Sequence, residues 1–181
     1  MTYRLSRSGA LPIARRISRA PSPLLAYAAP WLTIGLASIL PGWPLIAMAP
    51  VMPPLGFMTL LAWRQLRPGL LPVWAGFPLG LVDDLFSGQP VGSGMLLWSL
   101  TMITLEIIEA RFPWRNFLTD WLVASIFILI YIGLGALVAG LHDGWAILVP
   151  QIGLSVLCYP LVGRSVGWID RWRLTRFRVV G

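Results

Sequence analysis

Two adjacent carboxylates, Asp83 and Asp84, lie within an apolar stretch of this sequence and are the first candidates for acid–base chemistry. A catalytic pair of carboxylates must converge on one reacting group. Neighbouring residues of a helix point about 100° apart, so these two cannot form a facing dyad. The sequence places no nucleophile and no set of metal ligands beside them. The residue types therefore indicate a structural or binding role rather than catalysis.

Small residues recur around Asp84 at a spacing of four. The series comprises Gly76, Gly80, Asp84, Gly88 and Gly92. On a membrane helix such a ridge lets a second backbone approach closely. Glycine also tolerates unusual backbone angles, which suits a tight turn around Gly88 and Gly92. We predict that this series forms a partner-binding or structural motif.

The environment of Asp84 is open at this point. A carboxylate at the centre of a membrane helix costs about 2.5–3.5 kcal/mol, and less near an interface. Four environments would lower this cost: water at the outer surface, protonation on burial, hydrogen bonds to the glycine-rich turn, or a group on another protein.

Two further carboxylates, Glu106 and Glu109, are three residues apart and close to Arg111 and Arg115. Their spacing predicts an ion cluster at the end of a span, where it would anchor that end at the interface. The single cysteine, Cys158, falls in the last apolar segment and predicts neither a disulfide framework nor a metal cluster.

Six apolar segments must position these residues. Apolar residues make up 57% of the chain and charged residues 12%, against about 25% charged residues in a typical soluble domain. We predict an all-α polytopic membrane protein with six transmembrane helices, at 24–40, 44–62, 69–86, 91–109, 119–141 and 145–162. A basic tail at 1–23, a transmembrane domain at 24–163 and a basic tail at 164–181 then make up the whole sequence.

The distribution of arginine predicts the topology. The chain has 14 basic residues, all of them arginine, and its net charge is +7. All of them fall in the two tails or in the second and fourth connections, and cationic loops resist translocation. Both termini are therefore expected in the cytoplasm, with arginines anchored at anionic lipid of the inner leaflet rather than at nucleic acid. The expected anchors are Arg15, Arg16, Arg19, Arg64, Arg67, Arg111, Arg115, Arg164, Arg171 and Arg173.

The motif Gly80-Leu81-x-x-Asp84-x-x-x-Gly88-x-x-x-Gly92 resembles the signature of the MreD family, rod shape-determining membrane proteins of bacteria. Tyr159-Pro160 before a basic C-terminus is similar too. The family pattern has one aspartate, which corresponds to Asp84, so Asp83 is an additional acid in this chain.

The resemblance implies a non-enzymatic scaffold or regulator of cell-wall elongation in the bacterial inner membrane, with no cofactor. It implies a fold similar to the six-helix substrate-binding components of vitamin importers. The implied partners are an MreC-like protein with one span, the peptidoglycan glycosyltransferase and transpeptidase of elongation, and indirectly MreB. Since the outer connections hold no arginine or lysine, we hypothesise that a partner supplies a cation or donor to an unpaired Asp84.

Two other functional classes remain as alternatives. A small-molecule-binding component of a transporter is consistent with the proline-rich second and third segments, and it would need a pocket that opens outward. A membrane-embedded enzyme would need polar residues that converge from several spans, and the apolar segments offer mainly Gln65, Asp84 and Gln151.

Overall fold

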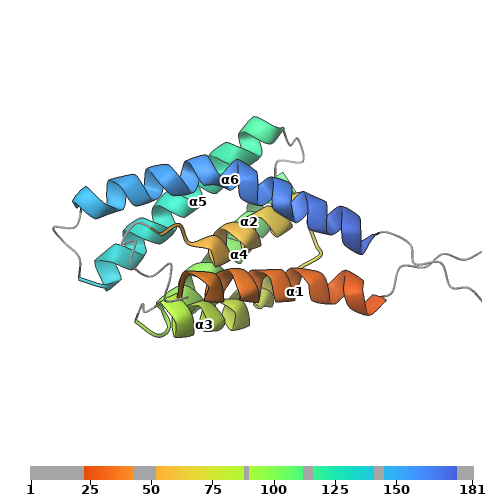
Figure 1. Ribbon diagram of the computed structural model, residues 1–181, viewed down its shortest axis with the longest axis horizontal. Helices are drawn as coiled ribbons and strands as arrows, with labels where there is room; N and C mark the ends of the chain where they lie inside the picture. Colours follow the sequence, from red (N-terminus) through yellow and green to blue (C-terminus); the bar gives the residue numbers. More distant parts are fainter. Residues whose placement is uncertain (1–22, 43–51, 88–89, 112–115, 141–144, 175–181) are drawn as a thin grey trace, which may run out of the picture.

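The computed structural model describes residues 23–42, 52–87, 90–111, 116–140 and 145–174. Within these residues the chain forms six α-helices and no strand (Figure 1). The six helices are α1 Pro23–Ile39, α2 Leu55–Leu66, α3 Gly76–Ser87, α4 Ser93–Arg111, α5 Phe117–Val138 and α6 Trp145–Arg173. Two short 3-10 turns, η1 Leu40–Gly42 and η2 Val73–Ala75, follow α1 and precede α3. The predicted all-α class is therefore confirmed for the described residues.

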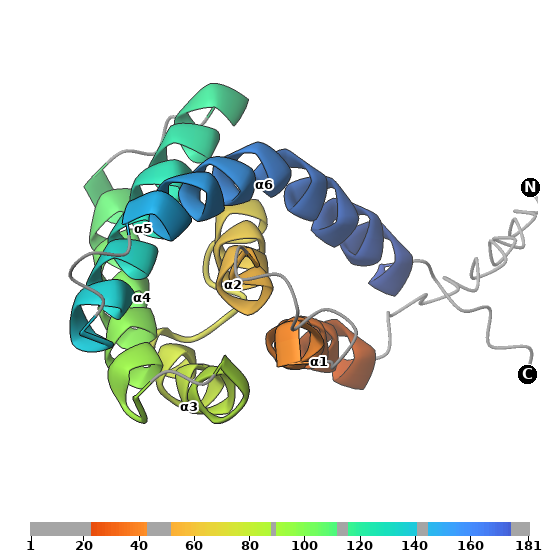
Figure 2. The same ribbon diagram turned by 60° about the vertical axis from the view of Figure 1, so that its left-hand side comes forward.

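Helix α2 lies at the centre of the bundle, and the other five helices surround it (Figure 2). Its residues from Gly56 to Gln65 are all buried. A helix that is apolar on every side can be covered on every side, and the run from Phe57 to Trp63 meets that condition. The helix begins directly after Pro54, a position that suits proline because proline cannot donate the backbone hydrogen bonds of a helix interior.

The outward faces of the surrounding helices are apolar. Large apolar side chains such as Leu36, Leu96, Leu122 and Leu157 are each more than 60% exposed. A monomeric soluble protein rarely presents so extensive an apolar surface. Three helices of the described part are long and apolar enough to cross a membrane: α4, α5 and residues 148–173 of α6, with mean hydropathies of 1.3, 2.5 and 1.4. These features are compatible with a membrane protein, and the six predicted spans stay a prediction.

The first residue of α1 and the last residue of α6 lie at the same end of the bundle in both views (Figures 1 and 2). Ion pairs join the last turns of α2, α4 and α6 at this end. We call it the arginine-rich end. The opposite end holds the turn between α3 and α4.

The helix bounds differ from the predicted segments in three places. In the second segment residues 52–54 are not helical and α2 begins at Leu55, while residues 44–51 lie outside the described part. The third is not helical before Val73, because Gly69 has a φ of +81° and Pro72 is extended. The last helix continues through Arg173, eleven residues beyond the end of the predicted span, so residues 164–173 of the predicted basic tail are helical. Hydropathy predicts the end of the apolar run, and the helix continues regularly after it.

Candidate functional site

The carboxylate of Asp84 caps the neighbouring helix α4. Asp84 Oδ1 accepts a hydrogen bond from the backbone N–H of Gly94 at 2.7 Å, and Oδ2 accepts from Gly92 at 2.8 Å and from Met95 at 3.2 Å. The Ser93 hydroxyl lies 3.4 Å from Oδ1. The first N–H groups of a helix have no partner within the helix, and a carboxylate also complements its dipole. Asp84 therefore acts as the N-terminal cap of α4 from the last turns of α3.

This geometry corrects the hypothesis of an unpaired acid. Asp84 is 3% exposed, and its two oxygens are occupied by donors of this chain. Of the four environments considered, the described residues show hydrogen bonding to the glycine-rich turn. A partner's cation would have to displace these backbone donors to reach the carboxylate.

Glycines bring the backbones of α3 and α4 into contact. A Cβ atom on Gly80 would lie 2.7 Å from Gly94 O, and one on Gly76 would lie 2.8 Å from Trp98 O. Because these atoms belong to the backbone, they cannot move aside as a flexible side chain can. Gly94 is equally confined, since its Cβ would lie 2.6 Å from Asp84 Oδ1. Gly94 was not among the predicted residues, although it stands in the same glycine-rich stretch.

Gly92 closes the turn between these helices. Its φ of +102° is a conformation that residues with a side chain rarely adopt. Gly88 lies outside the described residues. We refer to Gly76, Gly80, Asp84, Gly92 and Gly94 together as the glycine corner.

Asp83 has a separate role inside the bundle. It is 6% exposed, and Tyr131 of α5 donates a hydrogen bond to Asp83 Oδ2 at 2.7 Å. Phe57 of α2 stacks on the Tyr131 ring, with centroids 4.3 Å apart and planes 14° apart. The two aspartates thus point to different helices, as their adjacent positions on one helix require. Tyr131 was missed in the sequence, where a tyrosine within an otherwise apolar segment was the available signal.

The opposite end of the bundle contains a buried arginine. The side chain of Arg64 is 1% exposed, so it cannot anchor at lipid as predicted. Its Nη2 bonds to Glu106 and lies 3.0 Å from Glu109 Oε2, and its Nη1 donates to Leu71 O at 2.9 Å. The ion cluster expected around Glu106 and Glu109 is present, but α2 supplies this cation. Arg64 therefore joins α2 to α4, although it is distant in sequence from both glutamates.

A second ion cluster joins α2 to α6. Arg67 Nη2 and Arg173 Nη2 lie 3.0 Å and 2.7 Å from the two oxygens of Asp170, which is 4% exposed. The guanidinium of Arg173 also sits over the Trp63 ring, 5.0 Å from its centroid. Arg67 and Arg173 therefore bind α2 and α6 together at the arginine-rich end.

The other predicted anchors divide into two groups. Three are exposed: Arg111, Arg164 and Arg171. The remaining four, Arg15, Arg16, Arg19 and Arg115, lie outside the described residues.

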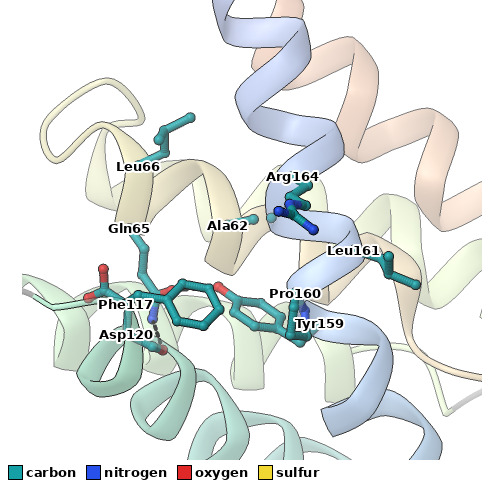
Figure 3. Close-up of a pocket in the computed structure, with 10 residues that line it drawn as sticks. Ala62, Gln65, Leu66, Phe117, Asp120, Tyr159, Pro160, Leu161 and Arg164 are labelled. Carbon is teal, nitrogen blue, oxygen red and sulfur yellow. Dashed lines mark hydrogen bonds between the residues drawn. The ribbon is translucent and has the colours of Figure 1, made fainter.

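A cavity of about 750 Å³ lies at the arginine-rich end between α2, α5 and α6 (Figure 3). Gln65 spans it, with Nε2 donating to Asp120 O at 2.9 Å and Oε1 accepting from the Tyr159 hydroxyl. The lining residues are Ala62, Gln65, Leu66, Phe117, Asp120, Tyr159, Pro160, Leu161, Gly163 and Arg164. A smaller cavity of about 280 Å³ lies between α4 and α5, with almost entirely apolar walls.

The described residues hold no group of three or more histidine, cysteine, aspartate or glutamate side chains that could bind a metal ion. Comparison with known proteins finds no family model, no curated protein and no solved structure that matches this chain.

Proposed function

We propose that this chain is a membrane scaffold of the MreD type, which supports cell-wall elongation through an MreC-like protein and the peptidoglycan synthases. The observation that carries the proposal is the glycine corner. Three of the residues on which the resemblance rests, Gly80, Asp84 and Gly92, meet there in one joint. A motif used for positioning in this way favours a scaffold over an enzyme.

The buried charges also favour a scaffold. Asp84 caps α4, Asp83 binds Tyr131, and Arg64 binds two glutamates. Catalysis by acid and base needs a group that is free to exchange a proton with a substrate. These groups instead hold helices together, which suits a protein that acts by presenting a fixed binding surface to partners.

The surface beside the glycine corner would receive the partner. Leu85 and Phe86 at the end of α3 and Val91 in the turn are 64%, 45% and 74% exposed. Leu96, in the first turn of α4, is also 64% exposed. A single apolar span of an MreC-like protein could pack here without any charge from Asp84, because packing rather than charge drives the association of membrane helices.

The proposed setting is the bacterial inner membrane, with six spans and both termini in the cytoplasm. Its support is the distribution of the fourteen arginines in the sequence. On this topology the glycine corner faces the periplasm, where the larger part of an MreC-like partner would lie.

Affinity purification in mild detergent from the native host tests the proposal. We expect the tagged protein to recover an MreC-like protein and the elongation synthases. Leu96→Trp should reduce this recovery severalfold, whereas Leu129→Trp, an equally outward position of α5 at 54% exposure, should leave it unchanged. Recovery of an ATPase module with a coupling subunit would instead identify a transporter component.

A further inference from the structure

The cavity at the arginine-rich end has a fixed shape. Gln65 of α2 is 9% exposed and hydrogen-bonds both to Tyr159 of α6 and to the backbone of α5. Figure 3 shows this side chain reaching from α2 to the backbone of Asp120, with both residues lining the cavity. Because three helices are joined through one amide, the cavity is preformed and does not depend on a ligand to open it.

One cation lines this cavity. Arg164 is exposed and forms no ion pair with any described residue. Three other arginines at this end, Arg64, Arg67 and Arg173, are all held by acidic side chains of the chain itself. Arg164 therefore keeps its charge available for a ligand.

The depth of the cavity matches a membrane interface. Trp168 and Trp172 follow Arg164 on α6, are 61% and 68% exposed, and stack with ring centroids 6.1 Å apart. Exposed tryptophans collect at the level of lipid headgroups. Apolar side chains such as Leu66 and Phe117 form much of the remaining wall, and Gln65, Asp120 and Tyr159 supply its polar part. A ligand at this depth meets a cation and an apolar surface together.

We propose that this cavity binds one anionic phospholipid, with its phosphate held by Arg164 and the adjoining part of an acyl chain against the apolar walls. Arginine binds phosphate through charge-assisted hydrogen bonds, and basic pockets between membrane helices are suited to anionic headgroups. The volume of about 750 Å³ accommodates a headgroup with part of a chain. This inference does not rest on the proposed scaffold function.

Native mass spectrometry of the full-length protein in mild detergent tests the proposal. Phosphatidylglycerol and phosphatidylcholine are added at equal concentration, and complexes with one bound lipid are counted. We expect phosphatidylglycerol to be retained preferentially. Arg164→Gln should lower its retention about tenfold, the loss of roughly one charge-assisted hydrogen-bonded contact, whereas Arg171→Gln on the same helix outside the cavity should not.

A second pair of variants tests the cavity itself. Gly163 lines the cavity and a Cβ there would meet no atom within 4 Å, so Gly163→Leu should fill part of the cavity and abolish lipid retention without disturbing the helix. Gly167→Leu is the matched control, because its Cβ is equally unobstructed but does not line the cavity.

Three outcomes would overturn the proposal. Equal losses in Arg164→Gln and Arg171→Gln would mean diffuse surface charge rather than a site. Equal retention of the two lipids would mean an apolar groove without headgroup recognition. Displacement of the bound lipid by excess inorganic phosphate would mean a site for free phosphate.

Discussion

The two ends of this bundle are held together by different kinds of contact. At the glycine corner the backbones of α3 and α4 touch, and Asp84 binds backbone N–H groups directly. At the arginine-rich end long side chains bridge the helices, as Arg64 and Arg67 do from α2. The cavity of about 750 Å³ lies at the second end.

This difference follows from the reach of the residues. Glycine adds no side chain, so two helices joined through it pack at the shortest separation and leave no space between them. An arginine spans several ångströms before its charge meets a partner, so helices joined through it stand further apart. We infer that the glycine corner is the more rigid end of the bundle. The arginine-rich end is then the end with room for a ligand.

The largest expected effect is at the cap of α4. Asp84→Ala removes the acceptor of three backbone N–H groups, of which that of Gly94 is buried. We expect a loss of about 4 kcal/mol in the free energy of unfolding, measured by detergent-induced unfolding in mixed micelles. Ser93→Ala removes a hydroxyl that lies 3.4 Å from Asp84 Oδ1 and donates to Pro90 O at 2.7 Å at an exposed site, so it should cost no more than about 1 kcal/mol. Similar losses in both variants would contradict the capping role.

Arg64→Met tests the arginine-rich end. It retains the length of the side chain but removes the buried guanidinium that contacts Glu106, Glu109 and the backbone of Leu71. We expect a loss of about 3 kcal/mol in the same unfolding assay. Arg67→Met breaks an ion pair whose arginine is 49% exposed, so it should cost less than about 1 kcal/mol. A larger loss of unfolding free energy in Arg67→Met than in Arg64→Met would mean that the ion pair with Asp170 contributes more to stability at this end.

Gly80→Ala tests the backbone contact. The added methyl group would meet Gly94 O and Met95 Cα at 2.7 Å, so α3 and α4 must separate. We expect a loss of about 2 kcal/mol from overpacking. Gly133→Ala, whose Cβ meets nothing within 4 Å, should be neutral or slightly stabilising because alanine favours helix. Equal thermal stability of the two variants would contradict the interpretation of the glycine corner as a rigid joint.

Local patterns in the sequence predicted local features well. The spacing of Gly76, Gly80 and Asp84 predicted a close ridge, because four residues are nearly one helical turn. Hydropathy predicted where α4 and α5 lie to within a few residues. These features depend only on neighbours along the chain.

Contacts between distant residues were not predictable from such patterns. Nothing in the sequence around Arg64 shows that it lies beside Glu106, 42 positions away, rather than at lipid. Topology rules assign an arginine to one end of a span, and burial at that end depends on which helices surround it. Arg64 is buried because α2 lies at the centre of the bundle. The same central position places Gln65 beside the cavity.

The smallest expected loss of stability is in Tyr131→Phe, which tests whether Asp83 helps to hold α3 in place. Tyr131→Phe keeps the ring that stacks on Phe57 and removes only the hydroxyl that donates to Asp83 at 2.7 Å. We expect a loss of about 1 kcal/mol, the net contribution of one hydrogen bond, while Tyr27→Phe at a 66% exposed position should change nothing. Hydrogen exchange of the α3 amides gives the sharper measurement. If Asp83 fixes α3 to α5, exchange should accelerate in Tyr131→Phe along α3, whereas unchanged exchange would mean that the glycine corner alone holds this helix.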